Sequence, residues 1–225
     1  MSRLIFDIET VGVDFEALDV TSQEALLRYA ESAEEEQEVK SQLGFSPLTG
    51  EIVAIGILNP DTDRGAVYFQ APGASAFETL NENGVQYVAA TEKEILKHFW
   101  ETIRYYDQFI TFNGRIFDCP YIMIRSAALK LQPTKNLMPN RYYDQHIDLL
   151  DRLTFFGAVR RKMNLHLWCQ AFGIESPKSK GITGEDVARL FREEQDYLTI
   201  ARYCFDDVKA TRELFSVWDK YINIK

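Results

Sequence analysis

Apolar runs with turn signals between them predict three strands in the first third of the chain. The runs lie at 3–8, 51–58 and 65–71, and the turn-forming sequence NPDTDRG separates the last two. Three successive strands with a short second connection indicate an antiparallel meander. Between the first two strands, an insertion at about 11–48 carries a helix-forming pattern around 22–43.

The pattern then changes to alternating helices and strands. Helical periodicity at 91–106 and 118–130 alternates with short apolar runs at 108–112 and 146–150. Such alternation predicts parallel strands that join the sheet through helical crossovers. Three more helical segments follow, at 162–172, 184–194 and 196–221. The sequence TGED at 183–186 has the spacing of a capping box before the second of them.

These elements together predict an α/β fold of the ribonuclease H-like arrangement. We expect a mixed five-stranded sheet, in which two parallel strands extend the antiparallel meander, with helices on its flanks. The chain contains no repeat, low-complexity linker or change of composition. We therefore expect 1–225 to form a single domain, with an acidic helical insertion at about 11–48.

Composition and charge narrow the class of protein. Hydrophobic residues make up 46% of the 225 residues, which excludes a disordered chain. The net charge of −9 argues against a broadly basic nucleic-acid-binding surface, although much of the acid lies at 30–38, a stretch typical of a solvated helix face. Basic residues collect later and form either a local phosphate track or a solvated surface: Arg160, Arg161, Lys162, Lys178 and Lys180.

Neither a membrane segment nor a disulfide framework is indicated. No run approaches the ~20 apolar residues of a membrane span, and the N-terminus lacks the features of a secretion signal. We therefore expect a cytoplasmic protein without membrane partners. Cys119, Cys169 and Cys204 are widely spaced without a C-x-x-C pair, so we interpret them as small buried groups.

Acidic residues in three separate segments are candidates for chemistry. Asp7 and Glu9 share one face of the first strand, where two half-buried like charges repel each other unless a cation binds both. A divalent metal or a solvated strand end would each explain the pair. Asp118 begins a helix, where an acid also interacts favourably with unpaired N–H groups. Tyr203 and Asp207 are four residues apart on the last helix, close enough to bind one water, although a half-buried tyrosine is common.

Taken in order, the three segments resemble a known family. FDIET near the start, TFNGRIFDCPYI in the middle and YCFDDVKAT near the end are similar to the three motifs of the DEDD superfamily of 3'-5' exonucleases. Tyr203 precedes Asp207 by four residues, as in the DEDDy branch, whereas the histidine branch would need His where Arg202 stands. Over about 3–216 the chain most resembles stand-alone exonucleases related to the proofreading domain of family-B DNA polymerases.

The resemblance implies a metal-dependent 3'-5' exonuclease. Asp7, Glu9, Asp118 and Asp207 would hold two divalent cations, Mg²⁺ or Mn²⁺, and Tyr203 would orient the attacking water. The substrate would be the 3' end of single-stranded DNA or RNA, with DNA preferred, and the products would be nucleoside monophosphates.

The same resemblance suggests where the strand binds. Thr10 and Asn113 would lie near the terminal nucleotide, and Phe117 would stack on a base. Arg160, Arg161 and Lys162 would contact the backbone. Phe155 and Phe156 are further candidates for stacking, although core packing is the more common role for each of these three phenylalanines.

Two other functions are compatible with part of this pattern. An inactive ribonuclease H-like module that binds nucleic acid or protein would suit the acidic net charge, but it leaves the four acids and Tyr203 unexplained. A glycosidase would use paired carboxylates but gives no role to the Tyr203 and Asp207 spacing. Serine hydrolases and nucleotide kinases are excluded, because the chain contains no G-x-S-x-G, G-x-x-x-x-G-K-[ST] or G-x-G-x-x-G sequence.

Overall fold

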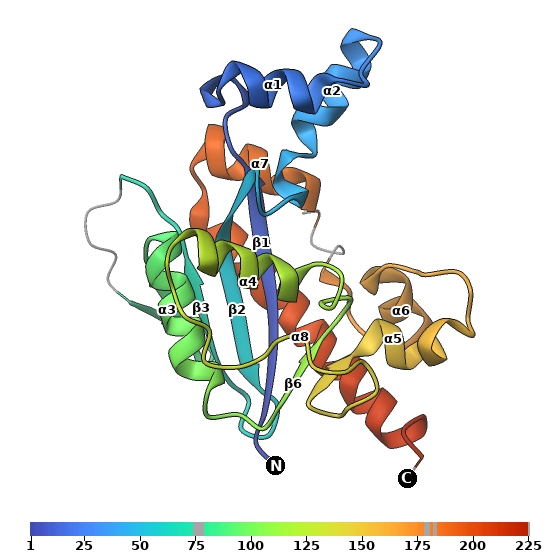
Figure 1. Ribbon diagram of the computed structural model, residues 1–225. Coiled ribbons are helices and arrows are strands. Elements are labelled where there is room, and N and C mark those ends of the chain that lie inside the picture. Colours follow the sequence, from blue (N-terminus) through green and yellow to red (C-terminus); the bar gives the residue numbers. More distant parts are fainter. Residues whose placement is uncertain (74–78, 178–180, 182–183, 225) are drawn as a thin grey trace.

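A mixed sheet forms the centre of the α/β fold in the computed structural model, which describes residues 1–73, 79–177, 181 and 184–224 (Figure 1). Within these residues the sheet has seven strands in the order β4-β5-β3-β2-β1-β6-β7. They are β1 (Arg3–Gly12), β2 (Gly50–Asn59), β3 (Arg64–Phe69), β4 (Leu80–Glu82), β5 (Val85–Ala89), β6 (Gln108–Thr111) and β7 (His146–Asp148).

The predicted arrangement is confirmed, but the prediction of five strands is wrong. β1, β2 and β3 form the antiparallel meander, and β6 and β7 extend it as parallel strands. The two additional strands are β4 and β5, of which β5 pairs in parallel with β3. Asn83 and Gly84 join them with φ values of 50° and 82°, the backbone that a tight hairpin turn requires. The pattern missed this hairpin because β4 has only three residues, of which Leu80 alone is apolar and is itself exposed.

Helices occupy the positions that the periodicity predicts, with some differences in length. They are α1 (Val20–Leu27), α2 (Ala33–Ser41), α3 (Glu92–Ile103), α4 (Asp118–Ala128), α5 (Leu149–Leu153), α6 (Leu165–Phe172), α7 (Val187–Arg189) and α8 (Tyr197–Tyr221). The strand predicted at 146–150 ends at Asp148, because the Asp148 carboxylate accepts a hydrogen bond from Leu150 N and caps α5. The helix predicted around 22–43 is interrupted before Ser32, which caps α2.

The helix predicted at 184–194 consists of three short turns of different kinds. A 3-10 turn at Gly184–Asp186, α7 and a π turn at Leu190–Glu194 follow one another. The capping box predicted for TGED includes Thr183, which lies outside the described residues.

Two apolar layers cover the faces of the sheet and confirm the alternation predicted for β1. Ile5 packs in the layer that contains α8, whereas Leu4 and Phe6 pack in the layer that contains α3 and α4. Asp7 and Glu9 have the same parity as Ile5, so they lie on the face that α8 covers.

Two glycines let α8 approach the sheet closely. A Cβ at Gly56 of β2 would lie 3.0 Å from Val208 Cγ2, and one at Gly65 of β3 would lie 2.6 Å from the Phe205 ring. Larger residues there would push α8 away from the sheet. The glycines therefore determine the height at which the side chains of α8 stand above β1.

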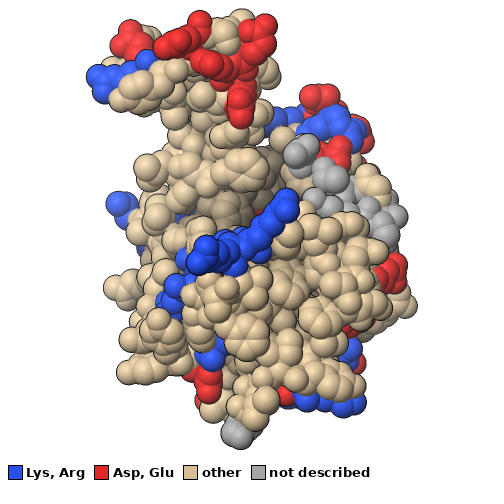
Figure 2. Space-filling model, turned by 90° about the vertical axis from the view of Figure 1, so that its right-hand side faces the viewer, with Lys and Arg blue, Asp and Glu red and all other residues tan. Residues whose placement is uncertain are grey.

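The acidic insertion stands apart from the sheet at the top of the molecule, as Figure 1 shows. Neither α1 nor α2 contains a buried residue. The acidic stretch at 30–38 is almost fully exposed, which confirms a solvated helix face, and acidic side chains cover this projection in Figure 2. Its base is tied to the domain by the Gly44 carbonyl, which accepts hydrogen bonds from Thr10 Oγ1 at 2.8 Å and Tyr121 Oη at 3.0 Å.

All three cysteines are buried free thiols, as predicted. Within the described ranges, no helix combines the length and the apolar character needed to cross a bilayer.

Candidate active site

A cleft of about 580 Å³ opens where β6 ends, beside the middle of the parallel strand β1. Ligands of open α/β sheets commonly bind at this edge, where the chain leaves the strands and enters loops and helices. Three candidate carboxylates and the candidate tyrosine line the cleft: Asp7, Asp118, Asp207 and Tyr203. Asp7 thus meets Asp118, 111 positions later, and Asp207, 200 positions later, in one place.

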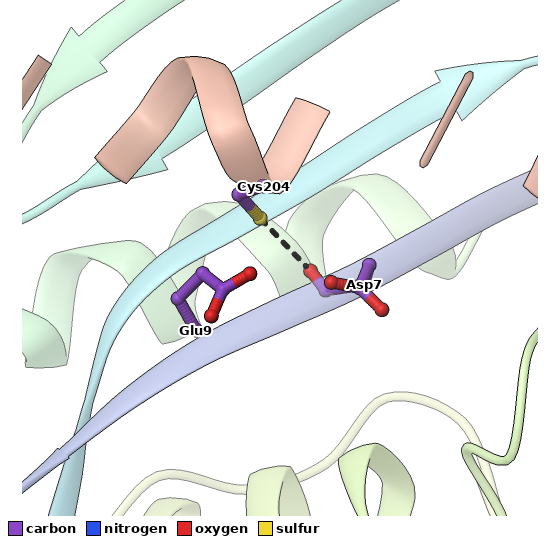
Figure 3. Close-up of side chains that lie close together, drawn as sticks. All are labelled: Asp7, Glu9 and Cys204. Carbon is purple, nitrogen blue, oxygen red and sulfur yellow. Dashed lines mark hydrogen bonds between the residues drawn. The ribbon is translucent and has the colours of Figure 1, made fainter. Parts of the chain in front are cut away.

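Strand β1 places Asp7 and Glu9 beneath α8. One ligand atom from each of Asp7, Glu9 and Cys204 lies within 4.8 Å of the other two. Figure 3 shows Cys204 over the two carboxylates, and its Sγ donates to the main-chain carbonyl of Asp7 at 3.6 Å. Burial raises the pKa of Cys204 well above its usual value, and the neighbouring carboxylates raise it further. Cys204 is therefore a neutral thiol that packs α8 against β1.

The turn between β6 and α4 places Asp118. Asp148, at the end of β7, accepts hydrogen bonds from Asn113 N and Arg115 N, both at 2.9 Å. Asn113 has a φ of 62°, a left-handed conformation that asparagine tolerates better than most residues. Asp118 begins α4 and accepts a hydrogen bond from Ile8 N at 3.2 Å, which links the helix directly to β1. Asp148 itself does not line the cleft.

Helix α8 supplies Tyr203 and Asp207 from successive turns. Tyr203 is 7% exposed, and its hydroxyl forms a hydrogen bond with Asp207. Burial is the main reason that the pKa of Tyr203 is raised, and the charges of Asp207, Glu9 and Asp7 add to it. The phenol therefore keeps its proton. The neighbouring Asp206 lies outside the cleft and pairs with Lys209 at 3.5 Å.

The carboxylates of the acidic cluster repel one another. Burial raises the pKa of Asp7 and of Glu9 well above the usual value, and the remaining contributions come from other carboxylates in the cluster. The pKa of Asp118 rises to about 7, mainly through burial, although hydrogen bonds from its own N–H and from Ile8 N oppose the change. Hard oxygen donors that repel one another in a buried place are the donor set that a divalent cation prefers. The residues present therefore fit such an ion.

Lowering the pH from about 8 to about 6.5 should stabilise the metal-free protein. The pKa of Asp118 is about 7 when folded and near 3.8 when unfolded, so in this window the folded state binds more protons and the free energy of unfolding increases as pH falls. The expected gain is about 1 kcal/mol. Urea unfolding in a chelator would measure it.

A second buried group, His146, opposes this effect, and two variants serve as tests of the role of Asp118. His146 acts in the opposite direction from about pH 7.5 downward and more strongly below 6.5, because burial lowers its folded pKa to about 3 and only the unfolded chain takes up that proton. Asp118→Asn should reduce the slope between about pH 8 and 6.5, and Asp206→Asn should leave it unchanged. A wild-type protein that loses stability across this window would contradict the prediction.

The candidate substrate contacts divide into two groups. Asn113, Phe117 and Lys162 line the cleft. Thr10, Arg160 and Arg161 do not: the Thr10 hydroxyl binds Gly44 O, and the two arginines are exposed outside the lining. Basic side chains nevertheless form a band beside a hollow on the face that carries α5 and α6 (Figure 2).

Phe155 and Phe156 also lie outside the cleft lining. Phe155 is 60% exposed, and the Phe156 ring packs against Tyr142 with 4.9 Å between ring centroids. Their φ values of 48° and 57° are unusual for residues with side chains of this size.

Apart from Lys162, the sequence analysis missed one wall of the cleft. This wall is formed by residues 162–166 and by Ser176 and Pro177. An Asn164 cap at the start of α6 was the available signal, since its side chain accepts a hydrogen bond from Leu167 N at 3.1 Å. Nothing in the local pattern indicates that this helix end faces β1.

Comparison with known proteins identifies a related family. Residues 66–224 match the family described as "Predicted 3'-5' exonuclease related to the exonuclease domain of PolB". The matched region includes Asp118, Tyr203 and Asp207, whereas Asp7 and Glu9 lie before it and meet the other three residues only in the folded chain.

Individual relatives are archaeal DNA polymerases. The chain is 31% identical to a DNA polymerase of Desulfurococcus sp. (strain Tok) over 144 residues, which are 56% of this chain and 18% of that protein. It is 28% identical to a DNA polymerase of Thermococcus aggregans over 145 residues, 56% of this chain and 8% of that protein. The structure of the family B DNA polymerase from Pyrobaculum calidifontis superposes with a TM-score of 0.59 and 19% identity over 96% of this chain and 24% of the polymerase. The chain thus spans a small part of each polymerase.

Proposed function

We propose that this chain, which belongs to the family of predicted 3'-5' exonucleases related to the exonuclease domain of PolB, removes nucleoside monophosphates one at a time from the 3' end of single-stranded nucleic acid. The observation that carries the proposal is the convergence of Asp7, Asp118, Tyr203 and Asp207 in one cleft, with Glu9 beside Asp7. A preference for DNA over RNA rests on the similarity to DNA polymerases.

Asp7, Glu9, Asp118 and Asp207 would hold two divalent cations, Mg²⁺ or Mn²⁺. Such ions, when bound, polarise the phosphoryl group, lower the pKa of the attacking water and stabilise the leaving 3' oxygen. The carboxylates themselves supply hard oxygen ligands on three separate elements, β1, α4 and α8. The hydrogen bond from Ile8 N fixes one oxygen of Asp118, which prepares the group before any ion arrives.

Tyr203 would position the attacking water. Its raised pKa keeps the phenol protonated, so the hydroxyl can donate to one partner and accept from another. Asp207 holds that hydroxyl from the next turn of α8, and the close packing at Gly56 and Gly65 fixes the helix. Tyr203 acts in this proposal through orientation and not as a base.

The cleft suits a single strand. Asn113 presents an amide near the terminal nucleotide, Phe117 presents a half-buried ring for stacking, and Lys162 presents a cation to the backbone. Stacking on an aromatic ring tolerates any base, which a processive exonuclease requires. A paired end would have to separate before its 3' nucleotide could enter.

The proposal predicts stepwise shortening of a 5'-labelled oligonucleotide in the presence of Mg²⁺ or Mn²⁺. Gel electrophoresis should show a ladder of products that differ by one nucleotide, and chromatography should show nucleoside monophosphates. A phosphorothioate at the 3' terminal linkage should block the reaction, because it alters the bond that is cut first. Strand binding without any shortening, across DNA and RNA and single and double strands, would instead support an inactive binding module.

Tyr203→Phe should lower kcat by about 10- to 100-fold, a typical loss when one positioned hydrogen bond to a reacting group is removed. The carboxylates remain, so metal-dependent thermal stabilisation should persist in this variant. Single-turnover kinetics and melting curves with and without Mn²⁺ would measure both quantities. An unchanged rate would remove the water-positioning role of the hydroxyl.

A further inference from the structure

The cleft lining also includes hydrogen-bond donors outside the acidic cluster. One of them is His166, whose ring forms a hydrogen bond with Ser176. His166 lies in the first turn of α6 and lines the cleft together with Lys162. Its Nδ1 lies 2.7 Å from Ser176 Oγ. Ser176 is 1% exposed, so its hydroxyl supports the ring without reaching far into the cleft.

Short-range structure fixes both members of this pair. Gly173 ends α6 with a φ of 69°, and Ile174 N then donates to Cys169 O at 2.9 Å, so the chain reverses and brings Ser176 back beside the helix. The buried Cys169 and Ile174 belong to the same apolar layer as α8. The histidine wall and the Tyr203 and Asp207 wall are therefore parts of one packed unit.

The hydrogen bond to Ser176 determines what the imidazole offers to the cleft. We assign the Ser176 hydroxyl as the donor to Nδ1, in which case a neutral ring carries its proton on Nε2 and offers a donor there. In the part of the chain that the structure describes, Nε2 has no hydrogen-bond partner. The carboxylates across the cleft are acceptors, whereas His166 and Lys162 are suited to an acceptor-rich ligand.

We propose that His166 donates from Nε2 to a non-bridging phosphate oxygen of the bound strand, one or two linkages before the bond that is cut, and that Ser176 is the residue that positions it. The inference rests on the proposed exonuclease function and adds a substrate contact to it. An enzyme that removes every nucleotide meets a different base in each cycle but the same phosphate, so a fixed donor to the backbone is the contact that serves every cycle.

A structural role for the pair makes a different prediction. If the Ser176 bond only ties the segment after α6 to the helix, substitutions at His166 would change stability and would have the same effect on every substrate. If the ring binds a phosphate, their effect would depend on the charge of one particular linkage. The two roles can therefore be separated by changing the substrate together with the protein.

The test is a double-mutant cycle that combines His166→Ala with a change in the substrate. In a single-stranded DNA oligonucleotide, a neutral methylphosphonate replaces one phosphate at a time, at each of the last few linkages upstream of the bond that is cut. Fluorescence anisotropy in Ca²⁺ would measure binding, and kcat/KM with Mn²⁺ would measure cleavage. At one linkage the neutral group should weaken wild-type binding by about 10-fold, as expected for the loss of a charge-assisted hydrogen bond. In His166→Ala the same group should change binding less than twofold.

Matched variants complete the experiment. Ser176→Ala should show a reduced coupling to the same linkage, His166→Gln should retain part of it through its amide donor, and Gln170→Ala, an exposed residue on the same helix, should behave as wild type. His166→Gln also keeps the test valid if the alanine variant does not fold. If the methylphosphonate weakened binding by the same factor in wild type and in His166→Ala at every linkage, while wild type still shortened the strand, this inference alone would be overturned. A wild-type protein that neither binds nor shortens the strand would overturn the exonuclease function and this inference with it.

Discussion

Replacing Asp207 with asparagine is expected to lower the rate of strand shortening by at least about 1,000-fold, equivalent to about 4 kcal/mol of transition-state stabilisation. The carboxylate lines the cleft, raises the pKa of Asp7, Glu9 and Tyr203, and receives the Tyr203 hydroxyl. Asparagine keeps the size of the side chain but removes the negative charge. A proposed metal ligand and a negative charge that acts on the other groups of the cluster would then be lost, while the packing of α8 would be preserved.

The neighbouring Asp206 provides a matched control on the same helix. Asp206→Asn removes a charge that pairs with Lys209 outside the cleft, so its shortening rate should stay within about twofold of wild type. Initial rates on a 5'-labelled strand, together with circular dichroism of each variant, would make the comparison. Equal losses in both variants, or full activity in a folded Asp207→Asn protein, would refute the assignment of Asp207.

Removing divalent cations is expected to abolish activity and to lower the melting temperature. The metal-free cluster confines several carboxylates that repel one another, and an ion that binds only the folded state adds stability. At about 100 times Kd the gain is about 2.7 kcal/mol, or roughly 5–10 °C for a chain of this length. Differential scanning fluorimetry in chelator, Mg²⁺ and Mn²⁺ would measure the shift.

Asp7→Asn distinguishes this effect from a general influence of salt. The variant removes a proposed ligand on β1, so the metal-induced rise in melting temperature should largely disappear. In chelator, the variant should melt at a higher temperature than wild type, because one buried like charge is gone. Asp206→Asn should keep the full shift. A wild-type protein whose melting temperature does not change at saturating metal would contradict the proposed ion site.

Much of the fold could be predicted because it depends on short stretches of sequence. The alternation in β1 assigned Asp7 and Glu9 to one face, and the structure places Ile5 on that face in the layer of α8. The meander and the parallel additions followed from the order of apolar runs and helices. The β4–β5 hairpin did not, because a strand of three residues carries too little periodicity to be recognised.

The functional site was predicted in part. Spacing and family resemblance selected Asp118, Tyr203 and Asp207, and the cleft contains all three together with Asp7. The assignment of Arg160 and Arg161 to the substrate strand stays a prediction, because both are exposed outside the cleft lining. A basic run in the sequence predicts where positive charge lies along the chain but not where the side chains point, since long side chains take their orientation from the surrounding surface.

The sequence by itself determined the elements, the face on which the acids lie and the residue types that suit a divalent cation. These features depend on neighbours a few positions apart, through the alternation of strands, the helical repeat and capping. Only the tertiary structure decided that the end of α6 faces β1, that Ser176 holds His166, and that burial shifts the pKa of Asp118 to about 7. Such features arise from contacts between segments far apart in the chain, which exist only once α6 and α8 have packed in the same apolar layer.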